Sequence, residues 1–83
     1  MYYIYILKSL RDSMLYTGRS DDLKRRIEEH GLGKVTATKN RRPLKLIFYE
    51  AFSCKSDAIR RERYLKTSKG KTTVKTMLME SLK

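Results

Sequence analysis

The chain has one cysteine (Cys54), one histidine (His30) and one proline (Pro43) among its 83 residues. A single cysteine excludes an internal disulfide, and without a second cysteine or clustered histidines no zinc site is predicted. No apolar run approaches the ~20 residues that a membrane-spanning helix needs. The apolar start, residues 2–7, is short, rich in tyrosine and not preceded by basic residues, unlike a cleavable signal peptide. We therefore expect a cytoplasmic protein.

Acidic residues are also scarce. Nine Asp and Glu stand against 20 Lys and Arg, which gives a formal net charge of +11. A field this positive on so small a chain favours a polyanionic partner, and nucleic acid is the leading candidate. An anionic membrane surface is less favoured, because no amphipathic helix with a large apolar face is predicted. Charge alone predicts phosphate binding and no particular chemistry.

The length predicts one domain, residues 1–83, because so short a chain can build only one core. Aliphatic residues are few, so six tyrosines and two phenylalanines must supply much of the core volume. Residues 2–7 and 15–20 are predicted to form an antiparallel hairpin, and residues 44–52 a third strand that we expect to be central. The expected fold class is α/β (α+β), with a three-stranded, mainly antiparallel sheet flanked by helices.

The first predicted helix follows the start signal at Ser20-Asp21-Asp22 and ends at Gly31 and Gly33. Within it Arg26 and His30 share a helical stripe with apolar residues, so both are predicted to point inward. On the preceding strand Tyr16 and Gly18 share a face, and the missing side chain at Gly18 leaves space beside the tyrosines.

A second helix is predicted from Asp57 to about Lys66, capped by Ser56. Glu62 lies on its apolar stripe, where a carboxylate is costly unless it is paired, hydrogen-bonded or metal-bound. Residues 67–71 are predicted to form a basic turn containing Gly70, followed by a last helix around Val74. Residues 34–43 contain no acid and no periodicity, which indicates an exposed basic loop.

These inward polar residues suit phosphodiester cleavage, which needs an activated water and neutralisation of phosphoryl charge. Tyr5 and Tyr16 could orient or deprotonate water, although a free phenol has a pKa of about 10 and needs a nearby cation to act as a base. Arg26 offers a planar, permanently charged fork for phosphate oxygens. Glu62 offers one hard oxygen ligand for Mg²⁺, an ion that otherwise keeps waters and substrate phosphates.

The sequence contains Tyr3-Ile4-Tyr5, Tyr16-Thr17-Gly18, Arg26, His30 and Glu62. Together these residues form a pattern that resembles the GIY-YIG endonuclease superfamily. Tyr3 replaces the first glycine of GIY, Thr17 replaces the isoleucine of YIG, and no asparagine follows Asn40, whereas several family nucleases have one near the site. Four further stretches resemble small stand-alone members related to the catalytic amino-terminal domain of the repair nuclease UvrC. They are Gly33-Lys34-Val35, Thr38-Lys39, Arg41-Arg42-Pro43 and residues 61–67.

The resemblance implies a metal-dependent DNA endonuclease that is weakly specific or guided by DNA structure, with a recruiting protein as an additional partner. It implies catalytic roles for Tyr5, Tyr16, Arg26, His30 and Glu62, with Glu62 holding Mg²⁺ or Mn²⁺. We expect contacts to the nucleic-acid backbone from Arg19, Lys34, Lys39, Arg41 and Arg42.

Less specific explanations stay open for the same residues. The tyrosines could be core residues, since aromatic side chains in strands are usually structural. Arg26 and Glu62 could simply be each other's salt-bridge partners, and His30 could contact the last carbonyls of its helix. The whole chain could be a non-catalytic nucleic-acid-binding module on the same scaffold, and RNA could replace DNA as its partner.

Overall fold

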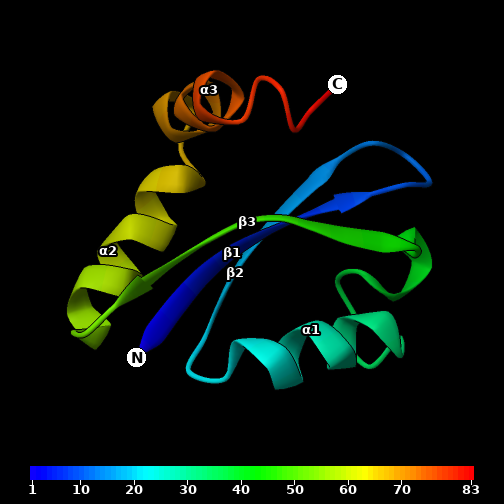
Figure 1. Ribbon diagram of the computed structural model, residues 1–83, viewed down its shortest axis with the longest axis horizontal. Helices are drawn as coiled ribbons and strands as arrows, with labels where there is room; N and C mark the ends of the chain where they lie inside the picture. The colour runs from blue at the N-terminus through cyan, green and yellow to red at the C-terminus, as the bar shows by residue number, and fades with distance from the viewer.

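A three-stranded antiparallel sheet forms the centre of the computed structural model, which describes residues 1–83 (Figure 1). Its strands are β1 (Tyr2–Ser9), β2 (Leu15–Ser20) and β3 (Leu44–Phe52). The order is β2-β1-β3, so the expectation that the third strand is central was wrong. Four consecutive residues of β1, from Ile4 to Leu7, are buried, whereas β3 has only half-buried and exposed positions, as an edge strand does.

Three helices cover the two faces of this sheet (Figure 1). Helix α1 (Leu23–Gly31) lies on one face, and α2 (Lys55–Leu65) and α3 (Ser68–Met77) lie on the other. None of them is long and apolar enough to cross a membrane.

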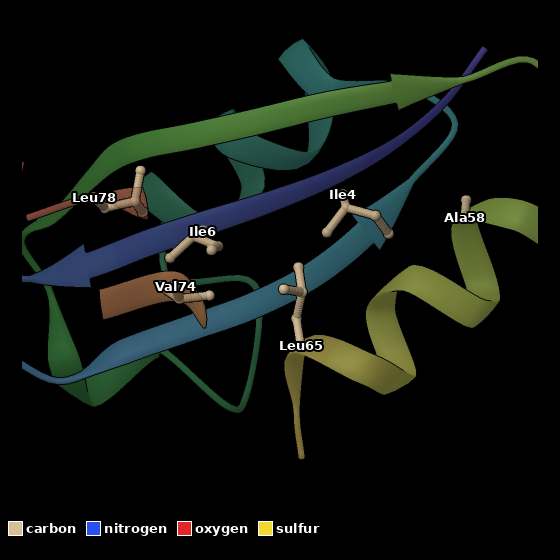
Figure 2. Packing of buried hydrophobic residues seen from close by; sticks show 6 residues of the cluster. All are labelled: Ile4, Ile6, Ala58, Leu65, Val74 and Leu78. Carbon is tan, nitrogen blue, oxygen red and sulfur yellow. The ribbon is translucent and has the colours of Figure 1, made fainter. Parts of the chain in front are cut away.

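The apolar core fills the space between the sheet and helices α2 and α3. Figure 2 shows Ile4 and Ile6 of β1 among side chains of the helical layer, and the cluster contains Ile4, Ile6, Ala58, Leu65, Val74 and Leu78. Because side chains alternate along a strand, Tyr5 points to the opposite face, toward α1. One strand therefore supplies the core on one side and a tyrosine on the other.

Helix α1 begins and ends as its sequence predicts. The Asp22 side chain caps it by accepting a hydrogen bond from the Arg25 backbone N–H at 3.1 Å. Gly33, just beyond the helix, has a φ of 75°, a conformation in which glycine is not penalised. These signals fix the position of Arg26 and His30 relative to the sheet.

The carboxy-terminal helices differ from expectation. Helix α2 begins at Lys55 after Cys54, and no side chain caps it, so the prediction of a Ser56 cap was wrong. Thr67 caps α3 by accepting from the Gly70 N–H at 3.0 Å, so residues 68–71 are helical and the predicted turn was wrong. Gly70 is there because a Cβ would lie 2.6 Å from the Leu65 Cα, and only glycine permits this approach of the two helices.

The basic segment 34–43 is not wholly exposed. It contains a short 3₁₀ helix, Lys39–Arg41, and two of its residues, Val35 and Thr38, are buried against the protein. The expected exposed loop is thus partly wrong, because these two side chains anchor it over the α1 face.

Candidate active site

A buried line of three polar side chains lies on the α1 face of the sheet. The Tyr5 hydroxyl is 2.8 Å from Nε2 of His30, and Nδ1 of His30 is 2.7 Å from the Thr38 hydroxyl. Tyr5 and His30 are each 1% exposed and Thr38 is fully buried. The line joins three distant parts of the chain, β1, the end of α1 and the basic loop, and satisfies both ring nitrogens of the histidine.

Gly18 makes room for this arrangement. It pairs directly with Tyr5 in the β1–β2 register, and a Cβ at Gly18 would overlap the Tyr5 phenol. The space that the sequence predicted beside the tyrosines is therefore filled by the Tyr5 ring itself.

Tyr16 completes a cluster of three rings. Its ring centroid lies 5.3 Å from that of His30 and 6.4 Å from that of Tyr5, and its side chain is half-buried. Both tyrosines and the histidine are thus side by side, with Tyr16 the one nearer to solvent.

Burial and the nearby Arg26 side chain determine the protonation states of Tyr5 and His30. Burial raises the pKa of the Tyr5 phenol, and hydrogen bonding to Arg26 opposes that rise. Burial also lowers the pKa of His30, and the Arg26 charge lowers it further. A neutral imidazole has one N–H donor and one acceptor nitrogen. His30 therefore donates to one of its hydroxyl neighbours and accepts from the other, and so couples Tyr5 to Thr38.

Arg26 and Glu62 do not pair with each other, so that alternative explanation of the two residues was wrong. Arg26 Nη1 lies 3.2 Å from Glu29 Oε1. Glu62 bridges two cations, with Oε1 3.2 Å from Arg19 Nε and Oε2 3.0 Å from Lys66 Nζ. Nor does His30 contact the helix carbonyls through its ring, because both nitrogens are used by hydroxyl groups.

A basic cavity of about 310 Å³ connects the two arginines at the end of β2. Arg19 and Arg26 both line it, although one belongs to β2 and the other to α1. Arg25 and Lys55 also line it, together with Asp21 and Glu29, so four basic residues stand against two acidic ones. Guanidinium groups that converge on one cavity suit the recognition of phosphate oxygens.

Glu62 is the carboxylate of this region that could hold a metal. Its side chain is 20% exposed, and it touches both the arginine of the cavity and Lys66. No group of three metal-ligating His, Cys, Asp or Glu residues exists in the structure. A single carboxylate with water and substrate phosphate fits the habits of Mg²⁺, provided that Arg19 and Lys66 share the carboxylate with the ion.

The residues expected to contact a nucleic-acid backbone fall into three groups. Lys34 and Lys39 are exposed and form no ion pair. Arg41 is paired with Asp12 at 3.3 Å, and Arg42 donates to the Lys39 carbonyl at 2.9 Å, so these two hold the loop in place. The structure brings only Arg19 of the five to the basic cavity.

Thr38 is the residue of this site to which sequence reasoning assigned no role. It lies in a segment without periodicity, and the resemblance that includes Thr38-Lys39 implied no chemical role for it. Only the folded path of the loop brings its hydroxyl to His30.

The chain is similar to known proteins over most of its length. The GIY-YIG catalytic domain family matches residues 1–76. UPF0213 proteins of Staphylococcus haemolyticus and Staphylococcus saprophyticus are 46% and 45% identical over 67 residues, which is 80% of this chain and 80% of each relative. The solution NMR structure of a UPF0213 protein from Bacillus halodurans is 34% identical, covers 93% of this chain and 85% of its own, and superposes with a TM-score of 0.58. The chain therefore belongs to the GIY-YIG catalytic domain family, a nuclease-type family with the three-stranded antiparallel architecture described above.

Proposed function

We propose that this protein is a metal-dependent endonuclease that hydrolyses DNA phosphodiester bonds and is weakly specific or guided by DNA structure. The observation that supports the proposal best is the contact of Arg26 with the Tyr5 phenol, because Arg26 also lines the cavity with Arg19 and so links that cavity to the Tyr5–Tyr16–His30 cluster. Hydroxyl groups that can position water thus lie beside guanidinium groups that can hold phosphate.

Tyr5 has the role of positioning the attacking water. Because burial raises its pKa, its phenol is protonated at neutral pH and acts first as a hydrogen-bonding group. Neutral His30 offers the acceptor nitrogen to which the Tyr5 proton can move when Tyr5 takes a proton from water. Tyr16, nearer to solvent, holds the same water from the second side.

Arg26 and Arg19 bind the scissile phosphate in the basic cavity. Their positive charge stabilises the negative charge that develops on the phosphoryl oxygens. Glu62 is the residue that would hold Mg²⁺, with Mn²⁺ as an alternative; when bound, the ion supplies charge neutralisation at the phosphate and lowers the pKa of a bound water.

A second candidate function is a non-catalytic nucleic-acid-binding module. The observation that favours it is the double ion pair of Glu62, whose two oxygens are both engaged by cations. In that case Arg19, Arg26 and the exposed Lys34 and Lys39 bind phosphates, and no bond is cut.

Nicking of supercoiled plasmid and of branched DNA distinguishes the two functions. Wild type, Glu62→Gln and Arg26→Ala are compared with Mg²⁺, with Mn²⁺ and with a chelator, and Glu28→Gln on the exposed side of α1 serves as the matched control. We expect metal-dependent nicks from wild type and Glu28→Gln, and at least about a 100-fold loss in the other two variants. Salt-sensitive binding without nicks from any protein would establish the binding module instead.

A further inference from the structure

The carboxy-terminal third of the chain carries charge that the proposed active site does not use. Residues 63–79 contain five Lys and Arg and no acid. Lys71 and Lys75 are both exposed on α3, and neither forms an ion pair. They lie one helical turn apart, where two like charges repel each other unless an anion lies between them.

These lysines border a groove of about 470 Å³ between β2 and helix α3. Half of the ten residues that line it are apolar, among them Met14, which is 62% exposed, and Leu15. Lys66, Lys71 and Lys75 form its basic rim. Strand β2 pairs only with β1, so its outer edge keeps backbone N–H and C=O groups open toward this side.

The groove begins at the proposed active site. Tyr16 belongs both to the ring cluster and to the lining of the groove. Lys66 lines the groove and contacts Glu62 at 3.0 Å. A strand of nucleic acid whose phosphate lies in the Arg19–Arg26 cavity would therefore reach the groove by passing Tyr16.

We propose that this groove holds an unpaired nucleotide next to the scissile phosphate, with its base against Met14 and Leu15 and its phosphate between Lys71 and Lys75. The proposal rests on the proposed function, because it places the occupant beside that active site. It also explains the selectivity that such an enzyme would have: a groove of this form favours a strand whose base is free to leave its stack.

A nucleotide fits this groove better than other anions because both of its parts are matched. The volume lies within the roughly 300–1,000 Å³ of small-molecule sites, and the apolar floor suits the face of a base. An acidic peptide would satisfy the lysines and leave Met14 and Leu15 without a partner. An anionic lipid surface needs a flat apolar face, whereas this surface is a groove.

Binding, measured without cleavage, tests the inference. Fluorescence anisotropy of a labelled single-stranded oligonucleotide, with a chelator present, gives the affinity of the full chain over a series of salt concentrations. Wild type is compared with Lys71→Ala/Lys75→Ala and with the matched control Lys24→Ala/Lys69→Ala, which removes two exposed lysines outside the groove. Unchanged thermal midpoints check that all three are folded.

We expect the groove variant to bind at least about tenfold more weakly. The slope of log affinity against log salt should become shallower by about 0.7, because the contact to one phosphate disappears. The control should keep the wild-type slope. An oligonucleotide with one abasic position should bind wild type about fivefold more weakly and Met14→Ala with no further loss, because the same stacking contact is removed in both.

Two results would overturn the proposal. One is an equal loss of affinity in the groove and control variants, which would show that only total charge matters. The other is competition by poly-glutamate or by anionic vesicles that depends on Lys71 and Lys75 as strongly as oligonucleotide binding does. If wild type does not nick DNA but its binding still depends on the groove lysines, the proposed endonuclease function is wrong and the proposed nucleotide site stands. The two failures are therefore distinguishable.

Discussion

The two faces of the sheet are built for different tasks, although the same central strand supplies both. Toward α2 and α3, β1 presents Ile4 and Ile6 to an apolar cluster. Toward α1 it presents Tyr5, whose neighbours are His30 and Thr38. One face is held by burial of apolar area and the other by hydrogen bonds between buried polar groups.

This difference explains how a chain with few aliphatic residues can keep a polar site at its centre. Apolar burial is non-directional and tolerates approximate packing, whereas a buried hydroxyl or imidazole must have its partners in place. No buried side-chain nitrogen or oxygen lacks a hydrogen-bond partner. The apolar face stabilises the fold, and the polar face can then hold Tyr5 in one position.

The adjacent residues Ile6 and Tyr5 allow the sharpest test of this division. Ile6→Ala should lower the free energy of unfolding by about 3 kcal/mol, because it leaves a cavity in the apolar cluster. For a chain of this size that lowers the thermal midpoint by about 15 °C. Nicking per folded molecule should stay near that of wild type.

Tyr5→Phe is the matched opposite change. It keeps the ring and removes the hydroxyl bound to His30, so we expect a loss of roughly 100-fold in nicking with a smaller loss of stability, about 1–2 kcal/mol. Thermal unfolding and plasmid nicking are measured on both variants. If Ile6→Ala were the more damaging to nicking per folded molecule, the division between the faces would be wrong.

Thr38→Val should give the next largest effect. The side chain keeps its shape and loses the hydroxyl, which leaves Nδ1 of His30 buried without a partner at a cost of about 1–2 kcal/mol. The tautomer of His30 is then set by Tyr5 alone, and nicking should fall about tenfold. Thr38→Ser keeps the hydroxyl and should restore most of both.

The ¹⁵N chemical shifts of the His30 ring provide a readout that a purely structural role would not move. They report which nitrogen carries the proton, and they should change in Thr38→Val and not in Thr38→Ser. Identical ring shifts in wild type and Thr38→Val would show that Thr38 has no influence on the tautomer.

Sequence patterns predicted those parts of the molecule that depend on neighbours along the chain. The alternation of side chains predicted the hairpin of β1 and β2. The capping residues predicted that α1 ends near Gly33, and helical spacing predicted the inward position of His30. The resemblance in motif spacing predicted the family, which the match over residues 1–76 confirms. The catalytic roles of these residues remain predictions.

The remaining features depend on contacts between distant segments, which local patterns do not contain. The central place of β1 follows from its pairing with both other strands, and Gly70 follows from a helix–helix approach rather than from a turn. Glu62 pairs with Arg19 from another element, whereas the expected Arg26 pairs within its own helix. Thr38 acquires its partner only because the loop folds back over α1.

The pH dependence of stability is the smallest effect, and it tests the polar face alone. The pKa of His30 is lowered below its ordinary value of 6.5, first by burial and then by Arg26. The unfolded chain therefore binds a proton that the folded chain does not, over a window that begins near pH 6.5 and extends downward. The free energy of unfolding should be level above that pH and should fall as the pH decreases through the window.

His30 is the only histidine, so the change in stability over this pH window is attributed to His30. The pKa of Asp12 is lowered below 3.8, chiefly by the Met14 backbone N–H, and its contribution is lost only at more acidic pH. Urea unfolding of wild type and His30→Asn at pH 7.5, 6.5, 5.5 and 4.8 measures the slope. Wild type should lose stability across this series and His30→Asn should not. Equal slopes in the two proteins would mean that the buried imidazole does not hold its neutral state, and the coupling of Tyr5 to Thr38 through it would have to be abandoned.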